Sequence, residues 1–326
     1  MNTWYEITPA DTLFFRGTEP LEAGQPVTQP LFPPPVSVIQ GAMRTAVLIQ
    51  NKVSFIDYKA GRCPDALFAQ IGRCGEPAPF HVTTLAFTVN DTLYVAAPAS
   101  WYVDLGQRKG EKPLCGEDFT GLSVTPIEPE TADQNPLNIC SSAGPHLPLL
   151  PLEDPFSLAG FWLRRDRLLE TAASPLQEKE ILAPADIYDI EPRTGIAMDS
   201  RRKVIQSQLY TASHVRLRPG VCLVIGMDKA PGLDSQGTIQ LGGERRMCTY
   251  RSIPAPEQPR DQGRVFMSPA PVAMTEKTVP EICCAGTPFT VAGWDLSKGF
   301  HKPTTTWLPA GSVFYKNINS HCIPLA

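Results

Sequence analysis

The stretch LFPPPVSVIQGAMRTA, residues 31–46, decides how the N-terminal part of this chain folds. Three prolines lead into a helix that we expect to begin at Ser37, because Ser is a favoured N-cap and Gln40 stands at capping-box spacing. The apolar residues have the spacing of a helix with one buried face, namely Ile39, Ala42, Met43, Ala46 and Val47. The opposite face carries small or polar residues, namely Ser37, Gln40, Gly41, Arg44 and Thr45. That face suits either a plain surface helix or a helix that another backbone approaches closely.

The composition of the 326-residue chain favours a folded protein that is rich in proline and not basic. Hydrophobic residues make up 42% of the chain, which is enough for a sizeable core. The 34 prolines cannot occupy helix interiors or central strands, so we expect many short strands joined by stiff loops. The net charge of -4 argues against a free-standing, non-specific nucleic-acid binder, although it leaves room for a local basic groove.

The nine cysteines are scattered and form no CxxC pair. Together with the lack of a secretory leader and of a long apolar run, they predict a reduced, cytoplasmic protein with free thiols. Zinc binding by Cys283 and Cys284 would need further ligands such as Cys63, Cys74 or His321, and adjacent cysteines fit one zinc site poorly. We therefore expect no metal and no other cofactor.

The order of predicted elements indicates an α+β protein with antiparallel sheets, such as paired ferredoxin-like βαββαβ units. Residues 98–155 contain many Pro, Gly and acidic residues and little periodicity, so they are expected to form a long insertion. The capping-box pattern of Ser174 and Gln177 predicts a helix that ends before Pro184. Strands are expected at residues 3–7, 82–89, 92–96, 161–163, 188–190, 209–215, 221–227, 238–241, 246–251, 265–267, 290–294 and 312–315.

Positive charge is concentrated in one segment of this acidic protein. A single acid, Asp199, stands there among six cations, namely Arg193, Arg201, Arg202, Lys203, Arg216 and Arg218. Residues 153–191, just upstream, hold nine acids against four cations. The basic segment suits a local contact with phosphates, and it equally suits pairing between the two segments within the protein.

A second candidate surface is rich in glycine. Gly242 and Gly243 precede Glu244, Arg245 and Arg246. Paired glycines let a backbone come close to a ligand, and the two arginines suit phosphate. Tight turns use the same residues, so this motif alone does not distinguish a ligand loop from a hairpin turn.

Signals of catalysis are weak in this sequence. It contains no GxGxxG, GxxxxGK[ST], HExxH or GxSxG motif. The five histidines are far apart in the sequence, and none has a carboxylate or cysteine at the spacing of a metal site. Each is expected to be a surface histidine or a histidine satisfied within the core.

Taken together, several blocks resemble a known family, subunit three of the Cmr module of type III-B CRISPR effector complexes, which belongs to the RAMP superfamily. The matching blocks are PADTLFFR (9–16), LFPPP (31–35), QGAMR (40–44), EPRTGI (191–196), LY (209–210), LGGER (241–245), GWD (293–295) and PAGSV (309–313). They stand in the order of the family and run from the first predicted strand to the last. The 98–155 insertion shows no match, and Gly17 to Pro20 replace a stretch that is often more polar in the family.

The resemblance implies two ferredoxin-like (RRM-like) domains, at residues 1–155 and 156–326. The second would carry a β-hairpin "thumb" at about 193–208 and a glycine-rich loop at 237–246. It also implies a non-catalytic subunit of antiviral defence that holds the 5′ repeat-derived tag of the CRISPR RNA. Its expected partners are that guide RNA, the large polymerase-palm subunit and the RAMP backbone subunits, with target RNA met only indirectly.

The residues that the sequence and the resemblance together assign to RNA binding lie in three regions and at one further arginine. They are Arg16, Ser37, Gln40, Arg44, Arg193, Arg201, Arg202, Lys203, Gly242, Gly243, Arg245 and Arg246. No catalytic or metal-ligating residue is assigned. Sequence-specific readers of RNA usually take single-stranded, splayed bases, and a repeat-derived tag is such a target.

Two other functions stay open from the sequence. A metal-independent endoribonuclease of the same superfamily would need a positioned general base, often histidine, near the first helix or the glycine-rich loop. No histidine precedes His81, and none lies between His214 and His301. A hydrolase or metal-binding protein unrelated to RNA is the third hypothesis.

Overall fold

The computed structural model describes residues 3–17, 29–106, 113, 115–127, 129–130, 147–148, 152–169, 174–199, 201, 203–257, 264–275, 283–295 and 297–325. Its contacts divide the chain into two compact units. Unit 1 comprises Met1–Thr83, Tyr188–Ala255 and Thr290–Thr306, and unit 2 comprises Thr84–Ile187, Pro256–Phe289 and Trp307–Ala326. Both units mix segments from distant parts of the chain, whereas the sequence-based division cuts it once at residue 155. The reason is that the first strand pairs with strands that lie more than two hundred residues later.

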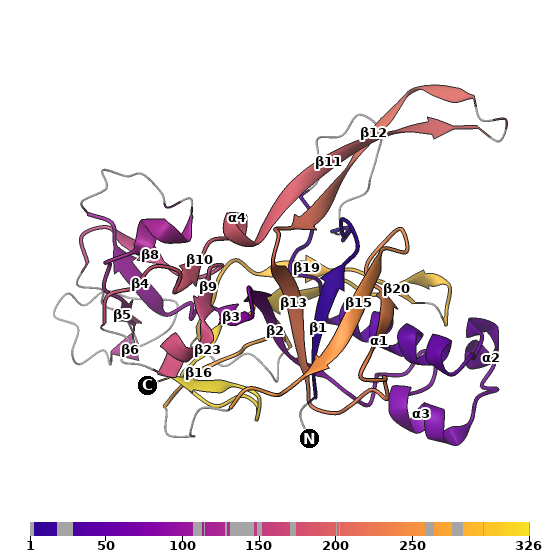
Figure 1. The fold of residues 1–326 in the computed structure, drawn as a ribbon, viewed down its shortest axis with the longest axis horizontal. Coiled ribbons are helices and arrows are strands. Elements are labelled where there is room, and N and C mark those ends of the chain that lie inside the picture. The colour runs from indigo at the N-terminus through magenta and orange to yellow at the C-terminus, as the bar shows by residue number, and fades with distance from the viewer. Residues whose placement is uncertain are drawn as a thin grey trace. The chain divides into compact units, whose positions relative to one another are not determined.

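Unit 1 is built on antiparallel strands around β1 (Thr3–Pro9). β1 lies between β13 (Val221–Met227) and β15 (Met247–Ile253), and β14 (Gln236–Gln240) pairs with the far edge of β15. Figure 1 shows β13, β1 and β15 side by side. Ile7, Leu223, Val224 and Ile225 are fully buried, so β13 is covered on both of its faces.

Helix α1 (Val36–Gln50) packs its apolar face inward, with Ile39, Met43 and Val47 fully buried. This confirms the predicted amphipathic helix. The predicted N-cap is wrong, because Pro35 occupies that position and no side chain caps the helix. Gln40 does not complete a capping box; its amide donates to the carbonyl of Phe80 at 2.9 Å. The proline run therefore sets the helix start without help from the serine hydroxyl.

Unit 1 also contains two short helices and a small hairpin. The helices are α2 (Phe55–Lys59) and α3 (Asp65–Ile71), and the hairpin strands are β20 (Trp294–Asp295) and β21 (Phe300–His301). The sequence predicted one strand over 290–294. The structure has two strands there, because β19 (Phe289–Val291) ends before β20 begins. The side chain of Ser54 accepts from the Asp57 amide at 3.1 Å, which caps α2.

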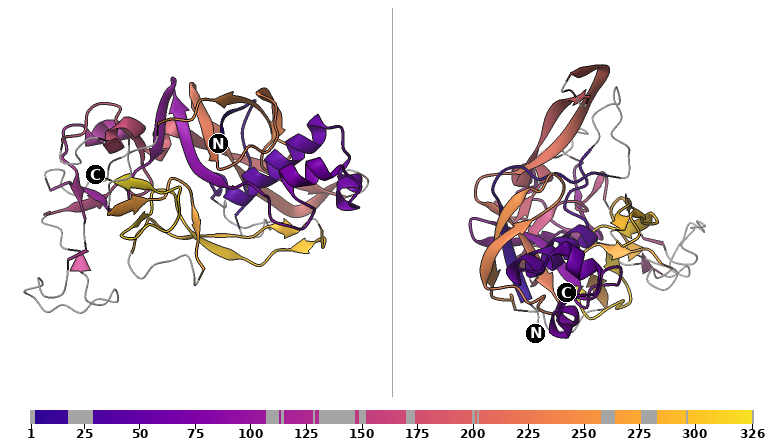
Figure 2. Two further views of the ribbon diagram at one scale, coloured as in Figure 1. Left: turned by 90° about the horizontal axis from the view of Figure 1, so that it is seen from below. Right: turned by 90° about the vertical axis from the view of Figure 1, so that its right-hand side faces the viewer.

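A long two-stranded ribbon projects from the sheet of unit 1. It consists of β11 (Tyr188–Met198) and β12 (Val204–Leu217), paired antiparallel with a register shift between Ile196 and Met198. Figure 2 shows the ribbon extending away from the sheet in the right-hand view. A bridge between Leu13 and Val215, both fully buried, fastens its base. The predicted thumb hairpin is present, with longer strands than the apolar pattern indicated.

Unit 2 contains a strand series in the order β10-β9-β3-β2. Its members are β2 (Val82–Val89), β3 (Thr92–Ala96), β9 (Trp162–Arg164) and β10 (Ile181–Leu182). Both residues of the turn after β2, Asn90 and Asp91, have positive φ, of 48° and 65°, as a two-residue hairpin turn requires. Phe87 packs edge-on against Trp162 with ring centroids 4.6 Å apart.

The described part of the 98–155 stretch is more regular than the sequence indicated. Its elements are β4 (Trp101–Asp104), η1 (Gly116–Phe119), β5 (Thr125–Pro126), β6 (Pro129–Glu130), β7 (Leu147–Pro148) and the start of β8 (Pro155–Ser157). β4 pairs with both β5 and β8, so this stretch forms a small sheet of unit 2. Strands of two or three residues are too short to show periodicity.

The predicted helix after Ser174 is wrong. The amide of Leu176 donates to the carbonyl of Leu122 at 2.9 Å, and the carboxylate of Glu180 accepts from the Gln177 amide at 2.8 Å. The first bond reaches a distant segment and the second a side chain three residues on, and both occupy amides that a helix would use. The nearby helix α4 (Pro184–Ile187) instead begins at the proline where the predicted one was to end.

The remaining elements of unit 2, including one strand (β22) that unit 1 shares, are short. They are η3 (Arg165–Leu169), β16 (Val265–Met267), β17 (Val272–Ala273), β18 (Cys283–Cys284), β22 (Thr305–Leu308), β23 (Val313–Phe314) and β24 (Ile323–Leu325). The mixture of few helices with mostly antiparallel strands confirms the α+β class. Two ferredoxin-like domains stay a prediction. Among the described helices, none is long and apolar enough to cross a membrane.

Candidate functional site

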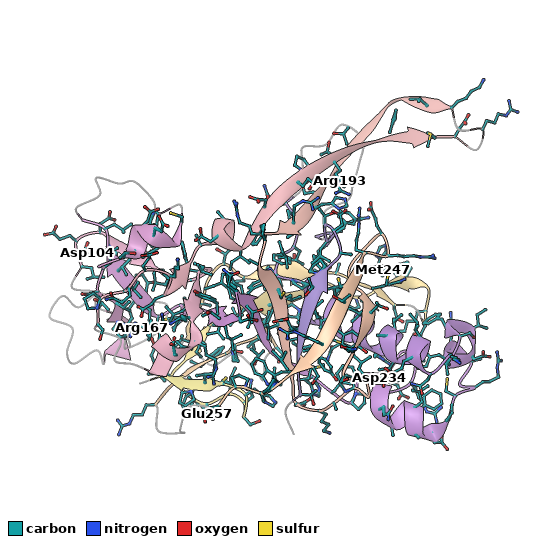
Figure 3. The ribbon with its side chains drawn as sticks, viewed as in Figure 1. Asp104, Arg167, Arg193, Asp234, Met247 and Glu257 are labelled. Carbon is teal, nitrogen blue, oxygen red and sulfur yellow. The ribbon has the colours of Figure 1, made fainter. Side chains whose placement is uncertain are left out.

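Six charged side chains meet at the base of the ribbon, and we call them the thumb-base cluster. They are Asp11, Glu191, Arg193, Arg216, Glu244 and Arg246. They come from the segment after β1, from both ribbon strands and from the turn between β14 and β15. Figure 3 shows Arg193 on the part of the ribbon nearer the sheet. Three arginines and three carboxylates make the cluster neutral overall.

Asp11 is the hub of this cluster. Its Oδ1 lies 3.0 Å from Nη2 of Arg216, and its Oδ2 lies 3.4 Å from Nη2 of Arg193 and 3.3 Å from Nη1 of Arg246. Glu191 pairs with the first two arginines again, at 2.7 Å to Arg193 and 2.8 Å to Arg216. One carboxylate thus holds three guanidinium groups that belong to three separate elements.

The ion pairs lower the pKa of both Asp11 and Glu191. Burial acts to raise the pKa of Asp11, but hydrogen bonds from Arg216 and Arg193 outweigh it, and the pKa is lowered. Hydrogen bonds from Arg193 and Arg216 likewise lower the pKa of Glu191. The Asp11 side chain is 47% exposed, so water and salt screen these pairs, and each contributes little to stability.

His214 lies beneath the cluster and is 1% exposed. Its Nδ1 is 3.2 Å from Oγ1 of Thr12, its ring stacks on Phe14 with centroids 5.0 Å apart, and its Nε2 is 3.9 Å from a carboxylate oxygen of Glu244. Burial lowers the pKa of His214. This histidine is therefore satisfied within the core, as expected from the sequence, and does not face solvent.

The glycine-rich loop is the tight turn that joins β14 to β15. A Cβ on Gly242 would lie 2.5 Å from the carbonyl oxygen of Phe14, and one on Gly243 would lie 2.7 Å from the Phe14 ring. The amide of Gly243 donates to that carbonyl at 2.8 Å. The two glycines are thus required by close packing on the segment after β1. At the turn itself, Arg245 is exposed and has a φ of 52°.

The far end of the ribbon also carries cations, but their pairing differs from that of the arginines in the thumb-base cluster. Arg201 and Lys203 are exposed, and neither side chain pairs with an acid in the part of the chain that the structure describes. The Asp199 carboxylate accepts from both of their backbone amides, at 2.8 and 2.9 Å, and so shapes the turn. Arg202 lies outside the described residues. Arg16 is exposed as well.

Arg44 is committed to the protein itself. Its guanidinium donates to the carbonyls of Glu76 at 3.0 Å and Arg73 at 2.6 Å, and to the hydroxyl of Tyr58. It therefore fastens the loop after α3 to α1 and is not an open phosphate contact. Ser37, Gln40 and Arg44 all line one cleft along α1, so the structure brings these three predicted residues together.

From the sequence, the basic segment suited either contacts with phosphates or pairing within the protein. In the structure, the two ends of the ribbon differ in this respect. Arg193, Arg216 and Arg218 pair with acids, the last with Asp189 at 2.9 Å, so internal pairing applies at the base of the ribbon. The cations at its far end fit the reading as phosphate contacts. The sequence alone did not identify Asp11 as a site residue, although residues 9–16 carry part of the family resemblance. Its three arginine partners lie 182 or more residues away in the sequence.

The comparisons with known proteins agree with this architecture. A family model described as "CRISPR-associated protein (Cas_Cmr3)" matches residues 5–321. The fold is similar to that of a chain in a cryo-EM structure of the Type III-B Cmr-beta bound to cognate target RNA and AMPPnP, with a TM-score of 0.53 and 14% identity over 95% of this chain and 85% of that chain. A second structure, of Cmr-beta bound to cognate target RNA, gives a TM-score of 0.52 and 16% identity with the same coverage. No curated protein sequence matches the chain.

Proposed function

Because the chain belongs to the Cas_Cmr3 family of CRISPR-associated proteins, we propose that it is a non-catalytic subunit of a type III-B Cmr effector complex that binds the 5′ repeat-derived tag of the guide RNA. The fold it shares with chains of Cmr-beta complexes bound to target RNA supports membership of such an assembly. The proposed protein partners are the large polymerase-palm subunit and the RAMP backbone subunits, and the proposed compartment is the cytoplasm. Two ferredoxin-like domains are the proposed framework.

The observation that carries the RNA-binding proposal is the contrast along the ribbon. At its base, three arginines share three carboxylates, whereas Arg201 and Lys203 at its far end have exposed side chains with no acid partner among the described residues. Unpaired cations on a projecting ribbon suit phosphates, which supply most of the affinity for nucleic acids. An acidic protein with one basic projection can bind RNA locally without being a non-specific binder.

Co-purification tests this function directly. The full-length protein, co-expressed with the other Cmr subunits and a CRISPR array, is expected to carry a short RNA of constant 5′ end. Fluorescence anisotropy with a labelled tag RNA should then show binding that weakens as salt rises. A complex that assembles and carries guide RNA equally well without this subunit would contradict the proposal.

One observation favours a second candidate, the metal-independent endoribonuclease. His81 Nδ1 lies 3.0 Å from Oδ2 of Asp228, and the His81 side chain is 66% exposed, so its Nε2 is available as a general base. Incubating the protein with repeat RNA and a chelator tests this reading. Cleavage that disappears in the His81→Ala variant would favour the nuclease over the non-catalytic subunit, while uncleaved RNA would favour the binding role.

A further inference from the structure

A cleft of about 420 Å³ runs along the polar face of α1, entirely within unit 1. It is lined by α1, α2, the segment from Cys74 to Ala78 and the hairpin of β20 and β21. Its volume falls in the range of about 300–1,000 Å³ that is usual for small-ligand sites. The polar face of α1 is therefore enclosed by neighbouring segments, and it suits a compact group better than a length of backbone.

The floor of the cleft is formed by small residues of α1. A Cβ built on Gly41 would meet no atom within 4 Å, so the space above this residue is open. One turn further on, the hydroxyl of Thr45 donates to the Gly41 carbonyl at 2.9 Å. Ser37, one turn earlier, is exposed. A flat group can thus lie against the helix with two hydroxyls within its reach.

Helix α2 supplies an aromatic side chain to the cleft, and the hairpin supplies charged ones. Phe55 of α2 lines the cleft and is 41% exposed. Asp295 and Lys302 line it from the hairpin. The hairpin is held close, because a Cβ on Gly75 would lie 2.9 Å from Oγ of Ser297.

The charges around the cleft are balanced and largely occupied. Arg44 and Lys302 stand against Glu76 and Asp295. The Asp295 carboxylate accepts from the hydroxyl and the amide of Ser297, at 2.6 and 2.9 Å, and the hydroxyl bond is the main cause of its lowered pKa. The Arg44 guanidinium is held by the backbone carbonyls of Arg73 and Glu76, as described above. A neutral, planar group with hydrogen-bonding edges fits this environment better than a polyphosphate does.

We propose that the cleft binds one unstacked nucleobase of single-stranded RNA, with the base against Gly41, Phe55 stacking on it or on its neighbour, and Lys302 at the adjoining phosphate. The aromatic edge and the hydroxyl-lined floor are what such a base requires, since bases outside a helix are held by stacking and by contacts to their edges. This proposal rests on the proposed RNA-binding function and assigns one base of the bound strand to a defined place.

The first test uses a substitution that fills the cleft and is compatible with helix α1. Gly41→Leu places a large side chain over the floor, and leucine favours helix more than glycine does, so the variant is expected to keep or raise its melting temperature. Gly41→Ala adds one methyl group to the same space and is expected to give a smaller loss. Titration of the full-length protein with a labelled single-stranded tag RNA should show about 5- to 150-fold weaker binding for Gly41→Leu and an intermediate loss for Gly41→Ala.

A second pair of variants tests the stacking side chain. Phe55→Ala is expected to weaken RNA binding, whereas Ile56→Ala, which removes the neighbouring and more exposed apolar side chain outside the cleft, should not. A fluorescent adenine analogue placed at each tag position in turn should report one position whose signal changes on binding and is lost in Gly41→Leu. Wild-type binding that both cleft variants retain, with that signal intact, would overturn the base site while the RNA-binding function stands. Absence of RNA binding by the wild-type protein would overturn both.

Discussion

Asp11 holds Arg216 at 3.0 Å across the base of the ribbon, and this contact joins the segment that follows β1 to β12. The same carboxylate also reaches Arg193 and Arg246. The Asp11 carboxylate is the anionic partner that the three guanidinium groups share. It keeps them aligned and at the same time lowers their attraction for other anions.

Replacing Asp11 by asparagine should therefore strengthen non-specific RNA binding. The change removes one negative charge from beside three arginines, so affinity for random-sequence RNA should rise and its dependence on salt should become steeper. Asp189→Asn is the control, because it removes the same charge beside Arg218. Stability should fall by no more than about 1 kcal/mol, since the pairs are partly exposed. Equal effects of the two variants in a filter-binding assay would contradict a special role of Asp11.

The double variant Arg201→Ala with Lys203→Ala should weaken binding of tag RNA and make its salt dependence shallower. Losing two phosphate contacts with a single strand lowers the slope of log affinity against log salt by about 1.4. Lys52→Ala with Lys59→Ala changes the net charge equally on exposed positions of unit 1 away from the ribbon. Anisotropy titrations across a salt series give the slopes. An unchanged slope in the ribbon variant would remove the far end of the ribbon from the RNA site.

Gly242→Ala should destabilise the protein more than Gly121→Ala does. Both glycines have positive φ, at 82° and 84°, so an alanine is strained at either place. Only at Gly242 would the added Cβ also meet a backbone atom, the Phe14 carbonyl oxygen at 2.5 Å, whereas nothing lies within 4 Å at Gly121. We expect a cost of about 1 kcal/mol for Gly121→Ala and at least about 2 kcal/mol for Gly242→Ala. Urea unfolding of both variants measures the difference, and equal costs would show that the loop adjusts.

His214 should make the folded protein less stable as the pH falls through about 6.5, the ordinary value for histidine. Its pKa is lowered in the folded state, chiefly by burial, so the unfolded state binds the proton first. The stabilising contribution of the neutral ring is therefore complete above the unfolded pKa and is lost as the pH drops toward the folded one. Asp11 and Glu191 have lowered pKa values and stay ionised over this range.

Free energies of unfolding measured between about pH 7 and about pH 5 check this prediction. The wild-type protein should lose stability over the range, and His214→Gln, although less stable at neutral pH, should lose less. Equal pH slopes for the two proteins would show that another group titrates.

Local patterns predicted most of the strands and the first helix, because each is fixed by side chains a few residues apart. The bounds of the strands at Val82–Val89 and Val221–Met227 follow from their runs of β-branched residues. The helix predicted after Ser174 failed for the opposite reason, since Leu176 bonds to Leu122 and not to its own neighbours. A capping-box pattern carries no information about such a distant competitor.

The candidate site was predictable in composition but not in arrangement. The sequence identified the basic ribbon and the paired glycines, and with the resemblance it assigned Arg193, Arg201, Arg202 and both glycines to RNA. The structure shows Gly242 and Gly243 packed on Phe14, and Arg44 bonded to backbone carbonyls. Each of these outcomes depends on which segment the fold brings alongside, and a charge count along one chain cannot supply that.

The interleaving of the two units has a consequence for how the protein is made. β1 leaves the ribosome first, but both strands that pair with it, β13 and β15, end only at Met227 and Ile253. At about 5–20 residues per second, β1 waits on the order of 10–50 s before its second neighbour exists. During that time its aromatic residues Trp4 and Tyr5 are without their final cover. A gene cut between β1 and β13 would therefore yield two fragments, and the sheet around β1 could form only when the two associate.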